Sequence, residues 1–191
     1  MARKKEFDQN VILDRALELF WELGYEHTSI QHLVEHLGIG RGSLYNAFGD
    51  KHSLFILALN RYLDKGLARI RRDLESEPPL EAIPYFFDKI VEETIADPQR
   101  RGCFYVNMTA EIAARDAEVA TILANHRKEV INVFETAVRN AQEAGASPDL
   151  NPHSAAEFFY NTLLGLRVSA KCAPDRASME RIVAMATSLL G

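Results

Sequence analysis

Apolar side chains recur at the spacing of an α-helix along almost the whole chain. In the first such segment they stand three or four positions apart, at Ile12, Ala16, Leu19, Phe20 and Leu23. Asp8 precedes this segment as a candidate N-cap, and Gly24 follows it as a stop. No segment alternates strictly between apolar and polar residues, which is the pattern of a half-buried strand. The sequence therefore predicts an all-α protein.

Two short helices are expected next. Thr28 and Gln31 have the spacing of a capping box, so Thr28 should cap a helix that ends at Gly38. After a turn at residues 38–40, a second short helix runs up to Gly49, and the residue after it, Asp50, is the expected cap of a long helix. Two short helices joined by a glycine turn, preceded by a longer helix, are typical of a helix-turn-helix.

Longer helices fill the rest of the chain. Beyond the break at Pro78 and Pro79 they are expected at about 80–96, from near Cys103, through 122–141, at 153–172 and at 176–190. We therefore expect a three-helix, helix-turn-helix domain at residues 1–52, joined to a larger helical ligand-binding and dimerisation domain at residues 53–191. The composition suits a folded globular chain, because 47% of its 191 residues are hydrophobic and 26% are charged.

The second short helix has one apolar and one polar face. Leu44 and Phe48 share a side and should pack on the first helix, which leaves Arg41, Tyr45 and Asn46 on the opposite side. A helix in the DNA major groove reads bases mainly from its N-terminal residues, so two turns suffice. Arg41 can bind a guanine with both ends of its guanidinium, and Asn46 can pair with an adenine. This face predicts DNA binding, although a merely solvated helical corner is the alternative.

The remaining candidate DNA contacts serve the sugar-phosphate backbone. The hydroxyls of Ser43 and Tyr45 can donate to phosphate oxygens, and Gly42 removes bulk where the helix approaches the duplex. Thr28 and Lys51 stand at the expected starts of neighbouring helices, where free amides favour a phosphate.

Charge and cysteine content restrict the other possibilities. The net charge is −5, but residues 1–72 hold 11 Lys and Arg against 9 Asp and Glu, while residues 73–191 hold 11 against 18. This split is compatible with a small DNA-facing module in front of an acidic body. Without an apolar run of roughly 18 residues or a secretory signal, we expect a cytoplasmic protein that does not bind a membrane. The two cysteines and the scattered histidines lack metal-ligand spacing, so no metal and no cofactor is expected.

The run ALELFWELGYEHTSIQHLVEHLGIGRGSLYNAFGDKHSLFILAL resembles the N-terminal domain of the TetR family of transcriptional regulators. The resemblance implies an all-helical homodimer whose heads bind a palindromic DNA operator and whose C-terminal domain releases it on binding a small inducer. At matching positions it implies that Thr28, Tyr45 and Lys51 touch phosphates. The same comparison places Arg41, Gly42 and Asn46 against bases. Gly40 departs from the serine cap that many relatives carry, and Asn46 stands where histidine is common.

A ligand cavity is expected where aromatic residues gather in the C-terminal half. Pockets for small molecules are mostly apolar with a few polar anchors. On this basis the candidate lining residues are Tyr85, Phe86, Tyr105, Met108, Phe159 and Tyr160. The alternative for each of them is that it simply fills the core between helices.

Cys103 is the other candidate for ligand chemistry. It follows Arg100, Arg101 and Gly102 and should lie near a helix start, and the cations and the helix end would both favour the reactive thiolate. The stretch RRGCFYVNMTAEIAARDAEV resembles a branch of TetR-like regulators in which a cysteine after glycine senses electrophiles or oxidants. A buried, inert cysteine is the alternative. A thiol-dependent enzyme is a further alternative, but Cys103 has no resolving cysteine at CxxC spacing and no obvious base or cofactor loop.

The last two helices are the expected dimer interface. One apolar stripe carries Phe159, Leu163, Leu166 and Ala170, and a second carries Ile182, Val183 and Ala186. The resemblance implies that these helices pack against their symmetry mates as a four-helix bundle. The stripes can equally complete the core of one protomer. The sequence as a whole favours a DNA-binding repressor without catalysis, which a small apolar inducer releases from its operator. It favours this over an enzyme or a helical adaptor that does not bind DNA.

Overall fold

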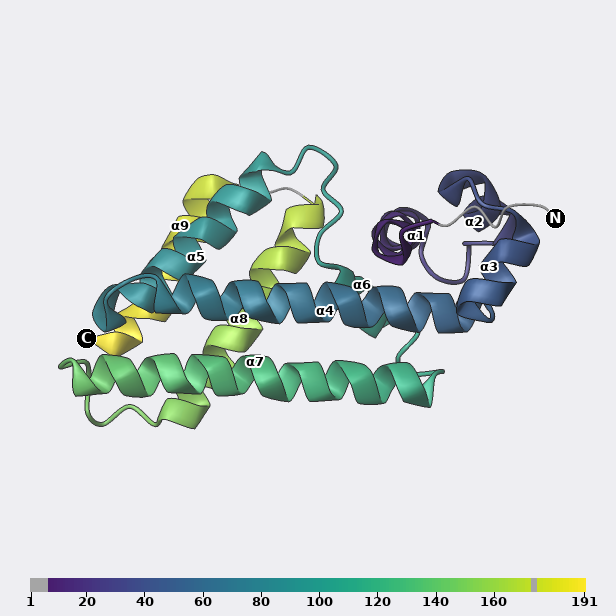
Figure 1. Ribbon diagram of the computed structural model, residues 1–191. Helices are drawn as coiled ribbons and strands as arrows, with labels where there is room; N and C mark the ends of the chain where they lie inside the picture. Colours follow the sequence, from purple (N-terminus) through teal and green to yellow (C-terminus); the bar gives the residue numbers. More distant parts are fainter. Residues whose placement is uncertain (1–6, 173–174) are drawn as a thin grey trace.

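The computed structural model describes residues 7–172 and 175–191, with Ala170 described in its backbone only. Within these residues the chain forms helices and no strand, which confirms the all-α prediction (Figure 1). In chain order the helices are α1 (Gln9–Leu23), α2 (Ile30–Leu37), α3 (Arg41–Phe48), α4 (Lys51–Glu75), α5 (Pro79–Ala96), α6 (Phe104–Glu111), α7 (Ala117–Glu143), α8 (Pro152–Cys172), α9 (Arg176–Thr187) and a short 3₁₀ helix (Ser188–Leu190).

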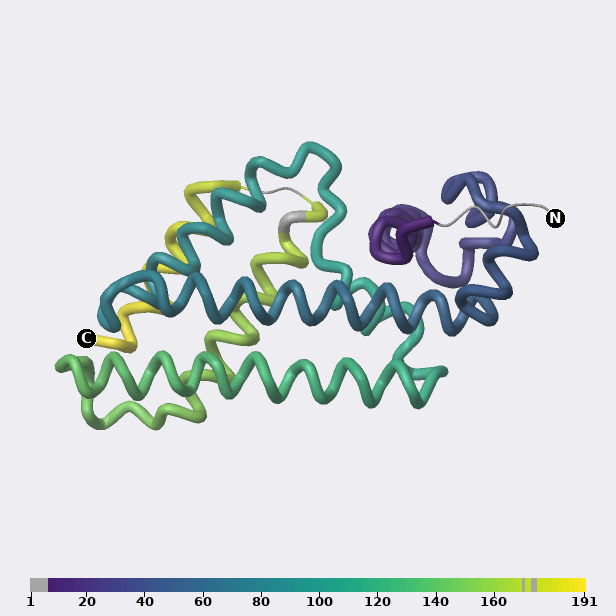
Figure 2. Tube along the Cα trace, viewed as in Figure 1, coloured from purple at the N-terminus to yellow at the C-terminus, as the bar shows by residue number. Residues whose placement is uncertain are grey.

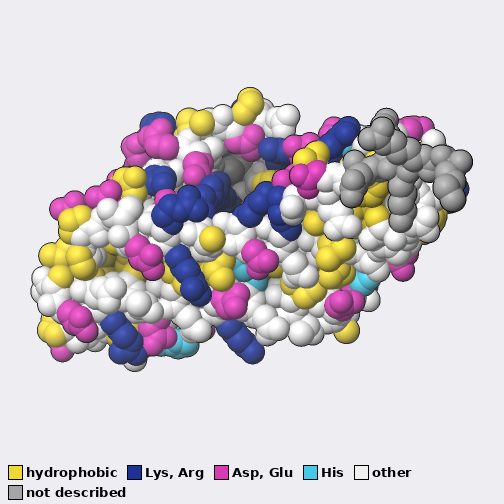
Figure 3. Space-filling model, in the orientation of Figure 1, with side chains coloured by type: hydrophobic (Ala, Val, Ile, Leu, Met, Phe, Trp, Pro, Cys, Tyr) yellow, Lys and Arg dark blue, Asp and Glu magenta, His cyan; other side chains and the backbone are white. Residues whose placement is uncertain are grey.

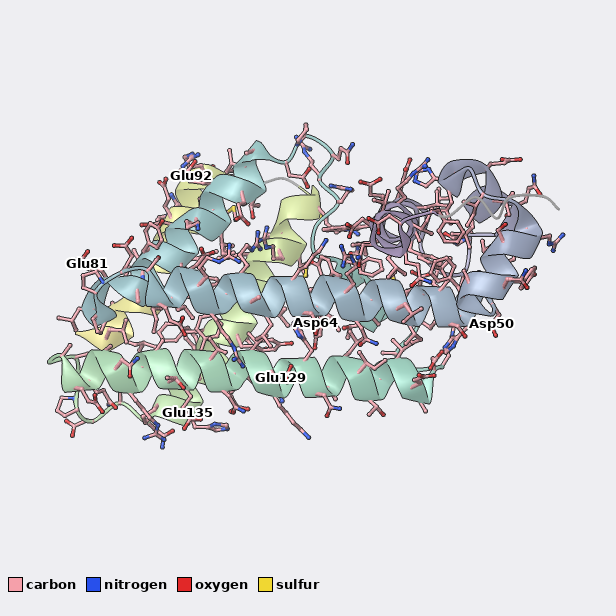
Figure 4. The ribbon with its side chains drawn as sticks, viewed as in Figure 1. Asp50, Asp64, Glu81, Glu92, Glu129 and Glu135 are labelled. Atoms are coloured by element: carbon pink, nitrogen blue, oxygen red, sulfur yellow. The ribbon has the colours of Figure 1, made fainter. Side chains whose placement is uncertain are left out.

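Helices α1, α2 and α3 form a head at one end of the molecule, and α4 leads from this head into the body (Figures 1 and 2). Two expected caps are in place. Asp8 accepts a hydrogen bond from the amide of Asn10 at 2.8 Å, and Asp50 accepts one from the amide of Ser53 at 2.7 Å. Figure 4 labels Asp50 where α4 begins. Gly38 ends α2 with a φ of 67°, a conformation that glycine adopts without steric cost.

The predicted cap of α2 is wrong by one residue. Ser29, not Thr28, is the N-cap: its hydroxyl accepts from the amide of His32 at 3.1 Å, and the His32 ring accepts from the amide of Ser29 at 3.4 Å. Thr28 is fully buried, and its hydroxyl donates to the carbonyl of Gly24 at 2.6 Å. Thr28 and Ser29 each precede by three positions a side chain that can complete a capping box, so the sequence allows either residue as the cap. Ser29 is the cap because the turn before α2 points Thr28 into the core.

Arg15 joins the first two helices. Its guanidinium donates to the carbonyl of Leu37 at 3.1 Å and also to the carbonyl of His36. These carbonyls lie in the last turn of α2 and therefore have no hydrogen-bond donor within their own helix. A cation at this end of the helix also interacts favourably with the helix dipole. The end of α2, and with it the turn into α3, is therefore held on α1.

The body is a layered helical bundle. Helices α4 and α7 lie side by side, α8 crosses them, and α5 packs on α4, α7 and α9 (Figure 1). Aromatic rings fill the centre: Phe134 lies 5.4 Å from Phe86, 6.1 Å from Phe87 and 6.2 Å from Phe159 between ring centroids. Since these residues come from α5, α7 and α8, the cluster ties three helices together.

Phe104 joins the head to the body. This first residue of α6 is fully buried. Its ring centroid lies 5.8 Å from that of Trp21 in α1, and 6.3 Å and 5.4 Å from those of Phe55 and Tyr62 in α4. The predicted domain boundary after residue 52 stays a prediction; it falls in the first turn of α4, a helix that serves both parts.

Replacing Phe104 with alanine should lower the free energy of unfolding by about 3–5 kcal/mol, because the cavity would open where three helices meet. Urea denaturation followed by circular dichroism measures this change. Leu57→Ala on the exposed side of α4 is the control and should change stability by no more than about 0.5 kcal/mol. Equal stability of the two variants would contradict the role given to Phe104.

Candidate nucleic-acid interface and ligand cavity

Helix α3 turns its polar face to solvent. Leu44 and Phe48 are buried against the head, whereas Arg41, Tyr45 and Asn46 are exposed. Arg41 and Tyr45 lie on the same side, since the guanidinium carbon is 5.9 Å from the centroid of the tyrosine ring. The three side chains that can read or grip a duplex thus point outward together.

The start of α3 is open to close approach. Gly42 and Ser43 are exposed, and a Cβ added to Gly42 would meet nothing within 4 Å. Gly40 caps the helix with its backbone alone, so no side chain occupies the first amides of α3. A partner surface can therefore come near the backbone here, and these amides can donate to an anion.

Two predicted phosphate contacts differ from expectation. Thr28 has no exposed surface, so its side chain cannot reach a phosphate unless the turn before α2 opens. Lys51 begins α4 as expected, but its ammonium donates to the carbonyl of Tyr25 at 2.9 Å and lies 4.2 Å from the centroid of the Tyr25 ring. A phosphate would have to compete with those two contacts.

A small cavity lies inside the body, with a volume of about 70 Å³. Phe86, Tyr105 and Tyr160 line it, in agreement with the prediction. Met108 and Phe159 do not, because both are packed into the core outside it. Tyr85 is also a wrong prediction, since it lies on the surface 37% exposed, with the ammonium of Lys89 5.5 Å from its ring centroid.

The cavity holds a linked pair of phenols. Tyr160 donates its hydroxyl proton to the hydroxyl of Tyr105 at 2.8 Å, and Tyr105 donates to the carbonyl of Leu123 at 3.4 Å. Burial raises the pKa of Tyr160, and the bond to Tyr105 adds to this effect. Burial lowers the pKa of His126, which also lines the cavity, so this ring is held neutral. The phenols and the neutral imidazole thus offer uncharged polar groups to a ligand, beside the two arginines Arg69 and Arg167 in the same wall.

Several lining residues were not predicted from the sequence: Tyr62, Gly66, His126 and Arg167. Tyr62 and Gly66 stand four residues apart on α4, which places them on one face of that helix. Arg167 is a cation inside the otherwise apolar run of α8. These patterns can be seen in the sequence, but they do not identify the helix that packs against each face.

Cys103 stands at the N-cap of α6, as expected, and its side chain lines the cavity. Its sulfur is 3.5 Å from the hydroxyl of Tyr62. Burial raises the pKa of Tyr62. Cys172, the other free cysteine, is exposed near the end of α8. Among the described residues, no group of three or more His, Cys, Asp or Glu side chains is arranged to hold a metal ion, and each helix is too short or too polar to cross a membrane.

Two polar contacts connect the head to the α6–α7 corner of the body. His52 near the start of α4 lies 2.7 Å from a carboxylate oxygen of Asp116, the N-cap of α7. The carboxylate of Glu111 accepts a hydrogen bond from the amide of Glu26 at 2.9 Å. Any movement of α6 relative to the head must change these contacts.

The predicted dimer stripes lie largely inside the protomer. Phe159, Leu166 and Val183 are buried in its core, and Leu163 lines the cavity, so for these four the core alternative holds. The exposed apolar residues of this region are Phe158 and Val168 in α8, Ile182 and Met185 in α9, and Leu189 in the 3₁₀ helix. Ile182 was predicted, and Ala186, although covered, lines a shallow groove with Phe158 and Met185. The side chain of Ala170 lies outside the described residues.

Comparison with known proteins identifies the family. Residues 12–58 match the bacterial regulatory proteins of the tetR family, and residues 79–186 match the tetracyclin repressor-like C-terminal domain. The chain belongs to the TetR family. This membership makes it a transcriptional regulator and excludes the thiol-dependent enzyme.

Similar TetR family members cover the chain from end to end. The regulator YezE of Bacillus subtilis (strain 168) is 34% identical over 194 residues, which is 100% of both chains. The repressor ComR of Escherichia coli (strain K12) is 29% identical over 99% of this chain and 90% of its own. A cysteine mutant of the TetR family regulator CifR, solved with a 26-bp double-strand operator DNA, is 29% identical over 100% of both chains, with a TM-score of 0.86.

The contact between Asp116 and His52 predicts a pH-dependent stability. The amide of Val119 and then the His52 ring hold the pKa of Asp116 below its usual range. The charged carboxylate therefore stabilises the fold above about pH 4, and this stabilisation is lost as the pH falls through the lowered pKa. Asp116→Asn keeps a cap acceptor but removes the charge, so it should lose less stability than the wild type between pH 7 and pH 3.

Urea denaturation at the two pH values measures this difference. Asp149→Asn in the exposed α7–α8 connection is the matched control and should follow the wild type. An identical loss of stability in Asp116→Asn and the wild type would show that the carboxylate charge has no such role.

Proposed function

We propose that this TetR family regulator is a homodimeric repressor of the cytoplasm that a small ligand releases from a palindromic DNA operator. The observation that carries the proposal is the outward face of α3, on which Arg41, Tyr45 and Asn46 are exposed together while Leu44 and Phe48 anchor the helix. Arg41 and Asn46 read bases, Gly42 allows the close approach, and Ser43 and Tyr45 donate to phosphates. The operator complex of the similar regulator CifR supports this arrangement.

A dimer follows from the small size of α3. One helix of eight residues contacts few base pairs, so two heads spaced by about 34–36 Å, or a multiple of it, would read two half-sites. The exposed apolar residues Phe158, Ile182 and Met185 on α8 and α9 form the surface best suited to a second copy. The buried neighbours Phe159, Leu166 and Val183 support that surface from beneath.

A ligand can release the operator because the cavity lies beside the junction between the head and the body. Tyr105 lines the cavity, and its neighbour Phe104 packs on Trp21 and Tyr62. A ligand that binds more tightly to a shifted arrangement of α6 favours that arrangement in proportion to the difference in affinity. The shift would strain the contacts of Glu111 with Glu26 and turn the two heads out of register with the DNA grooves.

Selection of bound fragments from random duplex DNA tests the proposal, and the recovered sequences should share a palindrome. On that operator Arg41→Ala should weaken binding by about 1–3 kcal/mol and relax selectivity at one position in each half-site, since one bidentate base contact is lost. Fluorescence anisotropy on the operator and its single-base variants measures both effects.

Arg139→Ala, which removes an exposed guanidinium from α7, is the matched control and should leave the affinity unchanged. Recovery of no shared sequence would overturn the proposal. So would a double variant, Arg41→Ala with Tyr45→Ala, that binds the duplex as well as the wild type; that result would favour a helical adaptor.

Cys103 supports a second candidate function, release of the operator by an electrophile or oxidant. The sulfur borders the cavity at the N-cap of α6, so its modification would act on the helix that contacts the head. In such a reaction the thiolate adds to the electrophilic carbon of a quinone, and the quinone takes up a proton. The exposed Cys172 is a competing target that any test must remove.

Treatment of the Cys172→Ser protein with a small quinone should abolish operator binding, and the same treatment of the protein with both cysteines replaced by serine should have no effect. Mass spectrometry of the intact protein counts the adducts while anisotropy measures DNA binding. Full modification of Cys103 without loss of DNA binding would remove this candidate and leave the repressor proposal intact.

A further inference from the structure

A wider vestibule lies beside the inner cavity, between α1, α4, α5, α8 and the α5–α6 connection. The two spaces share Tyr62, Gly66, Arg69, Cys103 and Arg167 in their walls, and the vestibule has a volume of about 370 Å³. Figure 3 shows Lys and Arg side chains gathered in the upper middle of the molecule. A ligand in the vestibule therefore lies against Cys103 and Tyr62, which also border the inner cavity.

Cations outnumber carboxylates in the vestibule. Its walls include the four cations Lys65, Arg69, Arg101 and Arg167 and the two carboxylates Glu93 and Asp97. Glu93 serves two of the cations, at 3.0 Å from Arg69 and 2.9 Å from Arg167. Lys65 pairs with Asp14, a residue of α1, at 2.7 Å. Both carboxylates are engaged, since the oxygens of Asp97 accept from the amides of Gln99 and Arg101.

Arg101 is the vestibule cation that lacks an ion pair within the described part of the chain. Its guanidinium carbon lies 4.7 Å from the ring centroid of Trp21, and its buried Nε atom has no hydrogen-bond partner there. The backbone beneath it is held firmly: the Trp21 indole and the Asn107 amide both donate to its carbonyl, at 3.3 Å and 3.1 Å. The structure thus holds a half-buried guanidinium in place without an acidic partner, so its terminal N–H groups can pair with an anion in the vestibule.

We propose that the vestibule and the inner cavity together bind a short-chain carboxylate. The carboxylate pairs with Arg101, and the alkyl chain passes Cys103 and Tyr62 into the cavity. A guanidinium binds a carboxylate through two parallel hydrogen bonds, and Arg101 is the vestibule cation without an ion pair in the described part of the chain. An apolar cavity of about 150 Å³ holds benzene, so the 70 Å³ here accommodates about three carbon atoms, the chain of butanoate. This inference rests on the proposed function and names the chemical class of its ligand.

Titration of the full-length protein with butanoate, 1-butanol and butylamine tests the proposal. Trp21 is the single tryptophan of the chain and contacts Arg101, so its fluorescence should change with saturation on adding butanoate. Isothermal titration calorimetry gives the affinity independently of the reporter. Butanoate should bind at least about tenfold more tightly than the alcohol or the amine, because only the anion pairs with Arg101.

Arg101→Gln should weaken butanoate binding by about tenfold or more and leave the weak binding of 1-butanol unchanged. Calorimetry is the readout for this variant, because the substitution itself alters the surroundings of Trp21. Arg139→Gln makes the same chemical change on α7 and should bind butanoate as the wild type does. Arg101→Lys keeps the charge and should bind with intermediate affinity, which protects the test against misfolding of the glutamine variant.

Equal affinity for butanoate and 1-butanol, or unchanged butanoate affinity in a folded Arg101→Gln protein, would overturn the proposal. Failure here is distinguishable from failure of the proposed function. A wild-type protein that recovers a palindrome from random DNA but does not prefer butanoate remains a repressor with a different ligand. A protein that prefers butanoate but recovers no DNA sequence binds the carboxylate without the repressor role.

Discussion

The packing of Phe104 against Trp21, Phe55 and Tyr62 is the contact on which the two halves of the molecule depend. It places the start of α6 between α1 and α4, so the body is anchored in the aromatic core of the head. This contact also fixes the positions of the residues that precede Phe104 in the sequence. Cys103 therefore borders the cavity, and Arg101 lies over Trp21. The sensing and the DNA-facing parts are thereby mechanically linked.

The same logic applies on a smaller scale in the head. Burial of Leu44 and Phe48 fixes the rotation of α3, and this rotation exposes the side chains that we propose to contact DNA. Arg15 adds a second restraint by holding the last carbonyls of α2. A recognition helix of two turns has too few internal hydrogen bonds to be stable alone, so its tertiary contacts determine both its stability and its direction.

Uneven pairing of charge distinguishes the sensor half from an ordinary helical core. Glu93 neutralises only part of the charge of Arg69 and Arg167, and Arg101 has an aromatic neighbour in place of an acidic one. The cavity beyond is lined mainly by phenols and aliphatic groups, with Arg69 and Arg167 where it borders the vestibule. On the carboxylate proposal, this cationic mouth would select ligands by charge and the cavity would select them by size, beside the α6–α7 contacts to the head.

The sequence by itself determined the features that arise within a few residues. Helical periodicity predicted the helices, the caps Asp8 and Asp50, and the polar face of α3, because caps and faces depend on neighbours one to four positions away. Only the tertiary structure decided that Thr28 is buried, that Tyr85 is exposed, and that Arg167 and His126 meet in one cavity. Those outcomes depend on how helices distant in sequence cross, and periodicity identifies an apolar face without naming the helix that covers it.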